Sequence, residues 1–597
     1  MTTITSTAAV QGWLDGFAVA LSRGDYSAAA AMFGPDAYWR DLVSFTWNIK
    51  TAEDPAAIRA MLEATMPLAH PSSWTIQGEG SEANGVTEGW FTFETAVGRG
   101  KGHLRLIGDK AWTMLTTLQQ LKGFEEKKGQ SRVKGVEHGN HPRRKTWLER
   151  KSEEDALLGF QKQPYVVIVG GGQAGIVLGT RLKKLGVPTI IIEKNAQPGD
   201  SWRNRYKSLC LHDPVWFDHL PYIPFPEDWP VFSPKDKIAD WLEMYAKVME
   251  LNYWGDTECQ RARFDETKQQ WDITVQRNGA TIVLQPTHVV LATGVSGVPQ
   301  LPSYVGMESF RGTQLHSSQF SSGEDWRGKK AVVVGSGNSA HDICADLWEH
   351  GADVTMIQRS STLVARSDTL MDLALGALYS EAAVTNGITT DVADLILASL
   401  PYKLLPVLQV PVYRQMKEHD AAFYARLEQS GFMLTFGEDD SGLLVMYLRR
   451  GSGYYVDVGG SELIADGRVR LMTGEIERIT ATGVEMKKGV ALPADLIVYA
   501  TGYSAMNSSV AQLVSQEMAE KVGKCWGLGS DTKKDPGPWE GELRNMWKPT
   551  QQPNLWFHGG NLQQSRHYSQ FLSLQVKARM EGIPTPVYGL APVYHAS

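Results

Sequence analysis

Residues 165–175 read Tyr-Val-Val-Ile-Val-Gly-Gly-Gly-Gln-Ala-Gly. The apolar run is typical of a buried parallel strand, and the glycines match the pattern G-x-G-x-x-G. A helix is predicted to follow through Leu178 and Leu182, and a second apolar strand over 189–192 ends at Glu193. Strand, glycine turn, helix, strand and acid in this order predict an α/β, Rossmann-like dinucleotide-binding fold. A glycine-rich turn that binds no ligand is the alternative.

The residues of this first motif have separate tasks. Gly170 permits the tight turn, Gly172 lets the backbone approach a pyrophosphate, and Gly175 lets the helix pack closely on the strand. The helix N-terminus supplies amide N–H groups and a positive dipole, and the acid can accept hydrogen bonds from a ribose diol. The candidate cofactor-binding residues are Gly170, Gly172, Gln173, Ala174, Gly175 and Glu193.

A second motif of the same kind follows an apolar strand over 329–334. Its helix leads into a strand over 352–357, after which an arginine and a serine stand where the first motif has its acid. These groups suit a 2′-phosphate and favour NADPH over NADH, although Arg359 could be an ordinary surface residue and use of both nicotinamides stays open. The candidate residues are Gly335, Ser336, Gly337, Asn338, Ser339, Arg359 and Ser360. FAD in the first site and NADPH in the second would let hydride pass from nicotinamide to flavin.

Length, charge and cysteine use exclude other classes. A chain of 597 residues exceeds one hydrophobic core and predicts three or four domains. A net charge of −7 gives no global basic field of the kind nucleic-acid binders carry. The cysteines are scattered without a C-x-x-C pair, which argues against a metal site and a redox dithiol. Residues 1–7 lack a signal-peptide pattern and no long apolar run is present, so we expect a cytoplasmic protein without membrane contact.

Residues 1–122 form a separate α+β unit in our interpretation. Helical spacing runs from Val10 to Leu21, a second helix starts at Asp54, and strand patterns occupy 90–93, 104–107 and 111–118. This order resembles the nuclear transport factor 2-like family, which implies a cone-shaped fold used as a small enzyme, a ligand cup or a dimerisation module. We expect dimerisation. Trp39, Asp41 and His103 could line such a cup, but lone polar residues are more often structural, so they receive no catalytic role.

The remaining boundaries follow from changes in composition. Residues 123–163 are polar and charged, which predicts a solvated tether, although the basic cluster at 141–145 could touch an anionic cofactor. The FAD-binding domain is expected over 164–325 and 495–597. The NADPH-binding domain is expected over 326–494, with a helical insertion at 366–450 that could cover the flavin. Near the end, a helix from about Tyr568 would point its N-terminus at the flavin, with Asn561 and Gln564 as candidate contacts.

Four segments together resemble the flavin-containing monooxygenases. Residues 310–320, Phe-Arg-Gly-Thr-Gln-Leu-His-Ser-Ser-Gln-Phe, are similar to the family fingerprint F-x-G-x-x-x-H-x-x-x-[YF]. Residues 199–203 are similar to its G-G-x-W loop, with Asp200 in place of the second glycine, and 292–294 and 500–503 look like its two A-T-G turns. The resemblance covers about 164–582. It adds these cofactor-binding candidates: Trp202, Arg203, Ala292, Thr293, Gly294, Ala500, Thr501 and Gly502.

Three features place the chain within this resemblance. Phe320 ends the fingerprint where the ketone-oxidising Baeyer–Villiger branch has tryptophan. His212 stands where many animal members have an asparagine near the flavin, and plant-type indole-pyruvate members also have Leu-His there. With its N-terminal extension the chain resembles a bacterial or fungal subgroup, sometimes called type II. Some members of that subgroup oxidise ketones and accept either nicotinamide.

The resemblance implies an NADPH-consuming, FAD-dependent monooxygenase that inserts one oxygen from O2 into a small organic substrate through a C4a-(hydro)peroxyflavin. His212 is the candidate catalytic residue, because an imidazole beside the flavin could bias protonation of the peroxide; a structural histidine is the alternative. His316 is expected to brace the junction of the nucleotide domains. Baeyer–Villiger oxidation, indole-pyruvate-like decarboxylation, an NAD(P)H oxidase or reductase, and a non-catalytic scaffold are the other functions considered. We expect a homodimer that binds no nucleic acid and no metal.

Overall fold

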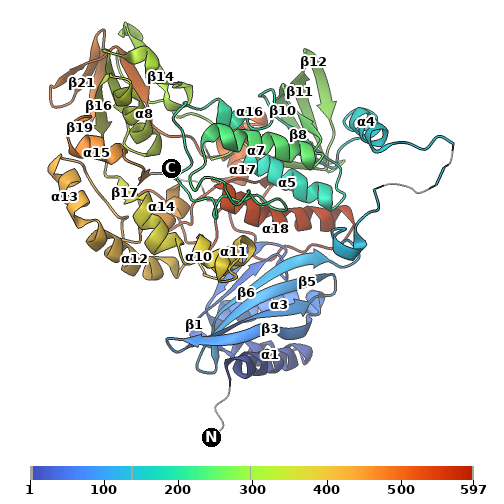
Figure 1. Cartoon of the computed structure of the whole chain (residues 1–597). Coiled ribbons are helices and arrows are strands. Elements are labelled where there is room, and N and C mark those ends of the chain that lie inside the picture. Colours follow the sequence, from blue (N-terminus) through green and yellow to red (C-terminus); the bar gives the residue numbers. More distant parts are fainter. Residues whose placement is uncertain (1–4, 136–138, 141, 296, 595–597) are drawn as a thin grey trace.

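The structure is a computed structural model that describes residues 5–135, 139–140, 142–295 and 297–594. Residues 1–4, which entered the signal-peptide argument, and His141 of the basic cluster lie outside the described residues. Figure 1 shows an N-terminal sheet unit, drawn in blue, below two α/β units. The long helix α18 (Leu562–Met580) runs between the N-terminal unit and the α/β unit that carries α5.

The N-terminal unit is a six-stranded sheet in the order β2-β1-β6-β5-β4-β3 with three helices. The strands are β1 (Phe33–Leu42), β2 (Ile49–Glu53), β3 (Ser72–Ala83), β4 (Val86–Glu94), β5 (Gly98–Ile107) and β6 (Lys110–Leu121). The helices are α1 (Ser6–Ser22), α2 (Tyr26–Ala30) and α3 (Asp54–Ala69). The Asp54 carboxylate accepts a hydrogen bond from the Ala57 amide at 2.9 Å, the contact that the predicted helix start requires. Assignment of this unit to the nuclear transport factor 2-like fold stays a prediction.

Aromatic side chains fill the space that a ligand cup would need. Trp39 is fully buried, and its indole N–H donates to the Thr116 hydroxyl at 2.9 Å. The same hydroxyl donates to Asp41 at 2.7 Å. Burial holds the pKa of His103 well below its usual value. The three residues that could have lined a cup are therefore buried structural groups. The packed rings are Phe17, Phe33, Trp39, Phe45, Trp74, Phe91 and Phe93.

The N-terminal unit is fixed to the rest of the chain by a buried ion pair. Arg40 Nε lies 2.7 Å from Glu542 Oε1, and Arg40 Nη2 lies 2.8 Å from Oε2. The same guanidinium donates to the Ala398 carbonyl at 2.9 Å and to the Tyr568 hydroxyl at 3.0 Å. Apolar residues of β1 and β6, including Leu42 and Leu118, belong to the hydrophobic core of the neighbouring α/β unit. The first 122 residues thus have their own aromatic core but do not stand apart.

The predicted tether contains a helix that its composition did not suggest. A 3-10 turn at Gly129–Ser131 precedes α4 (Trp147–Leu157), and no residue of α4 is buried. Thr146 and Glu149 form a reciprocal capping box at its start, which explains why a solvated helix begins there.

The first nucleotide unit is built on a parallel sheet in the order β24-β13-β7-β8-β9. Its strands are β7 (Val166–Val169), β8 (Thr189–Ile192), β9 (Tyr253–Trp254), β13 (His288–Leu291) and β24 (Leu555–Phe557). Its helices are α5 (Gln173–Lys184), α6 (Asp200–Arg203), α7 (Lys235–Val248), α16 (Asn507–Leu513), α17 (Gln516–Val522) and α18. An antiparallel ribbon of β10 (Thr257–Asp265), β11 (Gln270–Arg277) and β12 (Ala280–Leu284) is attached to it. The predicted helix start at Tyr568 is wrong, because α18 begins six residues earlier, after Asn561.

The second nucleotide unit has a parallel sheet in the order β14-β23-β15-β16-β19. The strands are β14 (Thr313–His316), β15 (Lys330–Val334), β16 (Asp353–Gln358), β19 (Arg470–Thr473) and β23 (Leu496–Tyr499). They pack with α8 (Asn338–Glu349), α15 (Gly460–Ala465) and the ribbon β20 (Ile476–Thr480), β21 (Gly483–Met486) and β22 (Ala491–Pro493). The expected limits 326–494 are wrong at both ends: Leu496 pairs with Thr313 and with Ala331, so β14 and β23 belong to this sheet.

A helical segment lies between β17 (Leu363–Arg366) and β18 (Tyr454–Asp457), which pair as a parallel ribbon. It contains α9 (Ser367–Leu370), a π-helical turn (Met371–Leu375), α10 (Glu381–Thr385), α11 (Thr390–Ala398), α12 (Leu405–His419), α13 (Ala421–Gln429) and α14 (Gly442–Arg450). The segment reaches α18 through a buried pair in which Arg566 Nε lies 2.8 Å from Asp394 Oδ2. Figure 1 draws these helices in yellow to amber, with α10 and α11 beside the N-terminal unit.

Candidate functional site

Gly170 and the first A-T-G turn meet at the carboxyl edge of the first parallel sheet. Gly170 has φ +111°, and its amide donates to the Ile192 carbonyl at 2.9 Å. The Ala292 amide donates to the Val169 carbonyl at 2.8 Å, which sets the turn 292–294 beside the glycine turn. A Cβ on Gly170 would lie 2.4 Å from the Ala292 carbonyl oxygen, and one on Gly175 would lie 2.0 Å from the Gly170 oxygen. Both positions therefore exclude any side chain.

The start of α5 has the features of a phosphate cradle. The helix begins after Gly172 without a side-chain cap, and its first turn, which includes Gln173 and Ala174, carries no acid. A Cβ on Gly172 would meet nothing within 4 Å except the Ser201 hydroxyl at 3.6 Å. The first amides of α5 thus stay available to an anion, and the helix dipole favours negative charge there. The residues present fit the pyrophosphate of a dinucleotide.

Glu193 stands at the end of β8, next to this cradle. Its Oε2 accepts from the Gly171 amide at 2.7 Å, and its Oε1 accepts from the amide and side chain of Asn195 at 2.9 and 2.7 Å. Only 8% of the residue is exposed. Carboxylate oxygens have further lone pairs, so a carboxylate fixed in this way can still accept hydrogen bonds from ribose hydroxyls.

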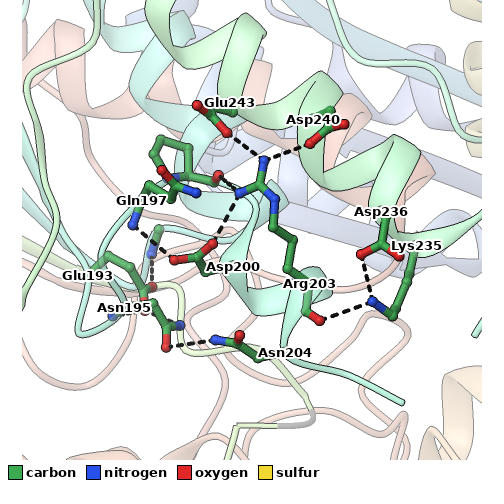
Figure 2. A network of polar contacts seen from close by, with 12 residues as sticks. Glu193, Asn195, Gln197, Asp200, Arg203, Asn204, Lys235, Asp236, Asp240 and Glu243 are labelled. Atoms are coloured by element: carbon green, nitrogen blue, oxygen red, sulfur yellow. Dashed lines mark hydrogen bonds and ion pairs between the residues drawn. The ribbon is translucent and has the colours of Figure 1, made fainter. Parts of the chain in front are cut away.

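Arg203 is committed to carboxylates of its own unit. Figure 2 shows its guanidinium between Asp200, Asp240 and Glu243, with Asp200 and Asp240 at 3.0 and 2.9 Å. Burial would lower the pKa of Arg203, but its hydrogen bonds to these three acids outweigh burial and raise it. Asp200, which replaces a glycine of the family loop, supplies one of the partners. The structure thus gives Arg203 a role in holding this loop, and Trp202 packs against the apolar cluster beside α7.

The second site repeats the geometry of the first. Gly335 has φ +131°, its amide donates to the Ile357 carbonyl at 2.9 Å, and the Ala500 amide donates to Val334 at 2.9 Å. A Cβ on Gly335 would lie 2.3 Å from the Ala500 oxygen. Helix α8 begins after Gly337, again without a side-chain cap or an acid in its first turn. The residues at this edge also fit a dinucleotide.

Side chains around the second glycine turn hold the neighbouring segments in place. The Asn338 side chain accepts from the Val456 amide at 3.0 Å, and the Ser336 and Thr362 hydroxyls lie 2.7 Å apart. Ser339 follows in the first turn of α8. Both positions after β16, Arg359 and Ser360, are exposed, and within the described chain Arg359 has no ion pair or hydrogen bond. Its guanidinium is therefore available to an anion.

The threonines of the two A-T-G turns form hydrogen bonds with different segments of the chain. The Thr293 hydroxyl lies 3.2 Å from the Ser509 hydroxyl, whereas Thr501 donates to the Gln300 carbonyl at 2.6 Å. The Gly502 carbonyl lies 3.0 Å from His316 Nε2. His316 thus joins the fingerprint segment to the second turn, and burial lowers the pKa of this histidine.

His212 lies where the two nucleotide units meet. Its Nε2 is 3.5 Å from Oδ2 of Asp342 on α8, and the Tyr206 hydroxyl donates to the same oxygen at 2.7 Å. Burial alone would lower the pKa of His212, but Asp342 and Asp213 outweigh it and raise the pKa above its usual value. Sequence reasoning missed Asp342, because the two side chains are far apart along the chain.

The N-terminus of α18 is contacted from the helical segment. Asn561 caps the helix by accepting from the Gln564 amide at 2.9 Å. The Tyr447 hydroxyl donates to the Gln564 side chain at 2.8 Å and accepts from the Asn561 amide at 3.1 Å. Sequence reasoning named no residue of 366–450 for the site, so Tyr447 is an addition.

Comparison with known proteins identifies the family. A sequence profile described as pyridine nucleotide-disulphide oxidoreductase matches residues 167–381. Indole-3-pyruvate monooxygenase YUCCA1 of Oryza sativa subsp. japonica is 29% identical over 342 residues, which cover 57% of this chain and 77% of the relative. Probable indole-3-pyruvate monooxygenase YUCCA8 of Arabidopsis thaliana is 31% identical over 346 residues, covering 56% of this chain and 74% of the relative. The chain belongs to the flavin-containing monooxygenases.

Two solved structures, a flavin-containing monooxygenase and a cyclohexanone monooxygenase, are similar as well. The enzyme from Stenotrophomonas maltophilia aligns with a TM-score of 0.46 at 19% identity, covering 70% of this chain and 99% of its own. Cyclohexanone monooxygenase from Rhodococcus sp. Phi1, bound to NADP+, aligns with a TM-score of 0.49 at 16% identity, covering 70% and 85%. All four cysteines of this flavin-containing monooxygenase, Cys210, Cys259, Cys344 and Cys525, are free. Within the described ranges, no helix has the length and apolar character of a membrane span.

Proposed function

We propose that the chain is an FAD-dependent, NADPH-consuming monooxygenase that transfers one oxygen atom from O2 to a small organic substrate. The observation that carries this proposal is the pair of uncapped helix starts, at α5 and α8, each facing a glycine turn and an A-T-G turn in one chain. Family membership supports the reaction type. Bound FAD supplies the electron transfer and oxygen activation that amino-acid side chains lack.

The chain's own residues would bind and orient the two cofactors. The first amides of α5 are proposed to hold the FAD pyrophosphate, with Glu193 accepting from its ribose. The first amides of α8 are proposed to hold the NADPH pyrophosphate, with Arg359 and Ser360 at the 2′-phosphate. Asn561 and Gln564 are proposed to present the N-terminus of α18 to the flavin. We assign Arg203 a role in fixing the loop 199–203.

Two substrate classes follow from different observations. Phe320 at the end of the fingerprint favours oxidation of a nitrogen or sulfur atom over ketone oxidation. The similarity to plant indole-3-pyruvate monooxygenases favours a 2-oxo acid as the substrate, which would be oxidatively decarboxylated. His212, whose pKa is raised, is the residue we propose to hold a proton beside the reacting oxygen.

A product screen with one sulfide, one cyclic ketone and one 2-oxo acid tests the proposal. NADPH consumption, product and hydrogen peroxide are measured together for each compound under air. We expect at least one compound to yield product in proportion to NADPH and to lower the peroxide yield. Release of one peroxide per NADPH with every compound would instead favour an NADPH oxidase.

A homodimer and a cytoplasmic location also stay proposals. Because Arg40 and one face of the N-terminal sheet are buried against the same chain, a dimer through this unit would use its other surfaces. The molar mass of the holoenzyme in solution tests the dimer.

A further inference from the structure

One carboxylate of the second nucleotide unit binds two side chains of the segment 204–234, which joins α6 to α7 of the first unit. Asp342 Oδ2 accepts from the Tyr206 hydroxyl at 2.7 Å and lies 3.5 Å from His212 Nε2. Tyr206 is buried at 4% exposure, and the side chains of His212 and Asp342 are largely shielded from solvent, at 11% and 9% exposure. A carboxylate in such a site is stabilised only if charge or hydrogen bonds compensate its lost hydration, and both partners come from the segment between α6 and α7.

The backbone around Asp342 is fixed on both sides. Helix α8 starts at the second glycine turn, so Asp342 lies one turn beyond the amides that face the dinucleotide site. The two partners of Asp342, Tyr206 and His212, lie on the segment that directly follows the loop 199–203, which Arg203 holds in place. A shift of either unit would therefore change the distance from Asp342 to the His212 imidazole.

Aromatic rings complete the surroundings of His212. The Tyr455 ring meets it edge to face at 5.9 Å between ring centres, and His341 stacks on the Tyr455 ring at 4.0 Å. The Tyr455 hydroxyl accepts from the amides of Val458 and Gly460, which fixes the ring. The titratable groups that face His212 or its ring neighbours are Asp342 and His341 on α8, Asp213 on its own segment, and Tyr455 and Asp457 from β18.

We propose that Asp342 is a positioning residue for His212: its carboxylate, 3.5 Å from Nε2, orients the imidazole across the junction of the two nucleotide units and favours its protonated form. Tyr206 holds the carboxylate in place through its hydrogen bond of 2.7 Å. The catalytic consequence of this arrangement rests on the proposed function, but the contact between the two residues does not.

The pair makes stability depend on pH in a defined direction. The folded-state pKa of His212 is raised above the value of about 6.5 that an unfolded histidine has. The stabilisation from the pair is therefore complete below that value, and it is lost as the pH rises through the folded-state pKa. Buried neutral histidines such as His288, whose pKa falls to about 3, have the opposite sign and destabilise the folded state only in acid.

Titration of His212 in the oxidised holoenzyme, without substrate, tests the proposal. Histidine is isotope-labelled, and the His212 resonance is assigned by its loss in His212→Gln. Asp342→Asn should lower the pKa of His212, because burial then acts with less opposition. Tyr206→Phe keeps the carboxylate and should leave the pKa above its usual value. Asp346→Asn is the matched control, since Asp346 lies one turn further along α8 and accepts from the Gly323 amide instead.

The proposal is overturned if Asp342→Asn leaves the titration of His212 unchanged, or if Asp346→Asn moves it equally. If Asp342→Asn does not bind FAD, the pair is tested instead by replacing its histidine, in His212→Gln. The stability of the wild type relative to His212→Gln should then fall as the pH rises through the His212 pKa, and a constant difference contradicts the pair. In turnover, Asp342→Asn should shift the pH profile of kcat in the same direction as the titration, with kcat about tenfold to a hundredfold lower.

Discussion

Replacing Arg40 by methionine should detach the N-terminal unit from the rest of the chain. Arg40 and Glu542 are 1% and 3% exposed, and they form two hydrogen bonds of 2.7 and 2.8 Å. Without the guanidinium, the Glu542 carboxylate keeps the Thr51 hydroxyl, at 2.7 Å, as a donor. Breaking a buried pair by removing one partner typically costs about 3–5 kcal/mol, because an uncompensated charge stays buried.

The free energy of unfolding is measured by urea titration of the holoenzyme, followed by tryptophan fluorescence. Limited proteolysis across residues 123–163, which contain the solvated helix α4 and lead from the N-terminal unit to β7, reports on undocking. Arg59→Ala is the control: it removes an arginine from an ion pair with Glu63 in which both side chains are about half exposed, and it should change stability by no more than the measurement error. Adding Glu542→Gln to Arg40→Met should recover part of the loss.

The reasoning fails if Arg40→Met loses no more stability than Arg59→Ala and the region 123–163 is cleaved no faster than in the wild type. Such a result would mean that apolar contacts of β1 and β6 alone hold the N-terminal unit in place. Failure of the double variant to recover any stability would likewise show that the buried charge of Glu542 is not the cause of the loss.

The nucleotide sites yield three further predictions. Gly175→Ala would put a Cβ 2.0 Å from the Gly170 oxygen, so it should abolish FAD retention on purification, whereas Gly12→Ala, which meets nothing within 4 Å, should not. Glu193→Gln keeps the shape but loses the charge, and it should raise the FAD dissociation constant about tenfold, measured by fluorescence of released flavin; unchanged flavin content would refute the ribose assignment. Arg359→Ala should raise KM for NADPH at least tenfold and leave KM for NADH nearly unchanged, and equal losses for both nucleotides would exclude a 2′-phosphate contact.

Local sequence patterns predicted those strands, turns and helices that a single short segment determines. The run 165–175 and its counterpart at 329–339 encode strand, turn and helix within one stretch, and the structure has β7 with α5 and β15 with α8 there. The start of helix α18 is predicted too far along the chain, because the helix is buried on nearly all sides. A helix with polar residues such as Gln563 and Arg566 in the interior shows no amphipathic period, and tertiary hydrogen bonds satisfy these groups instead.

The contacts that join the units could not be predicted in the same way. His212 and Asp342 are separated by more than a hundred residues, and Arg40 and Glu542 by 502. Sequence spacing carries no information about such pairs, since they depend on how folded units dock. For the same reason the aromatic packing of the N-terminal unit, which buries the three residues that could have lined a ligand cup, could not be inferred from Trp39, Asp41 and His103.

Oxygen insertion is tested most directly with isotopically heavy dioxygen. The holoenzyme is supplied with NADPH and the compound that best suppresses peroxide release, and the product is analysed by mass spectrometry. We predict that one heavy oxygen atom enters each product molecule, with one NADPH consumed. A product that carries oxygen from water, or heavy label found only in hydrogen peroxide, would contradict the assignment as a monooxygenase.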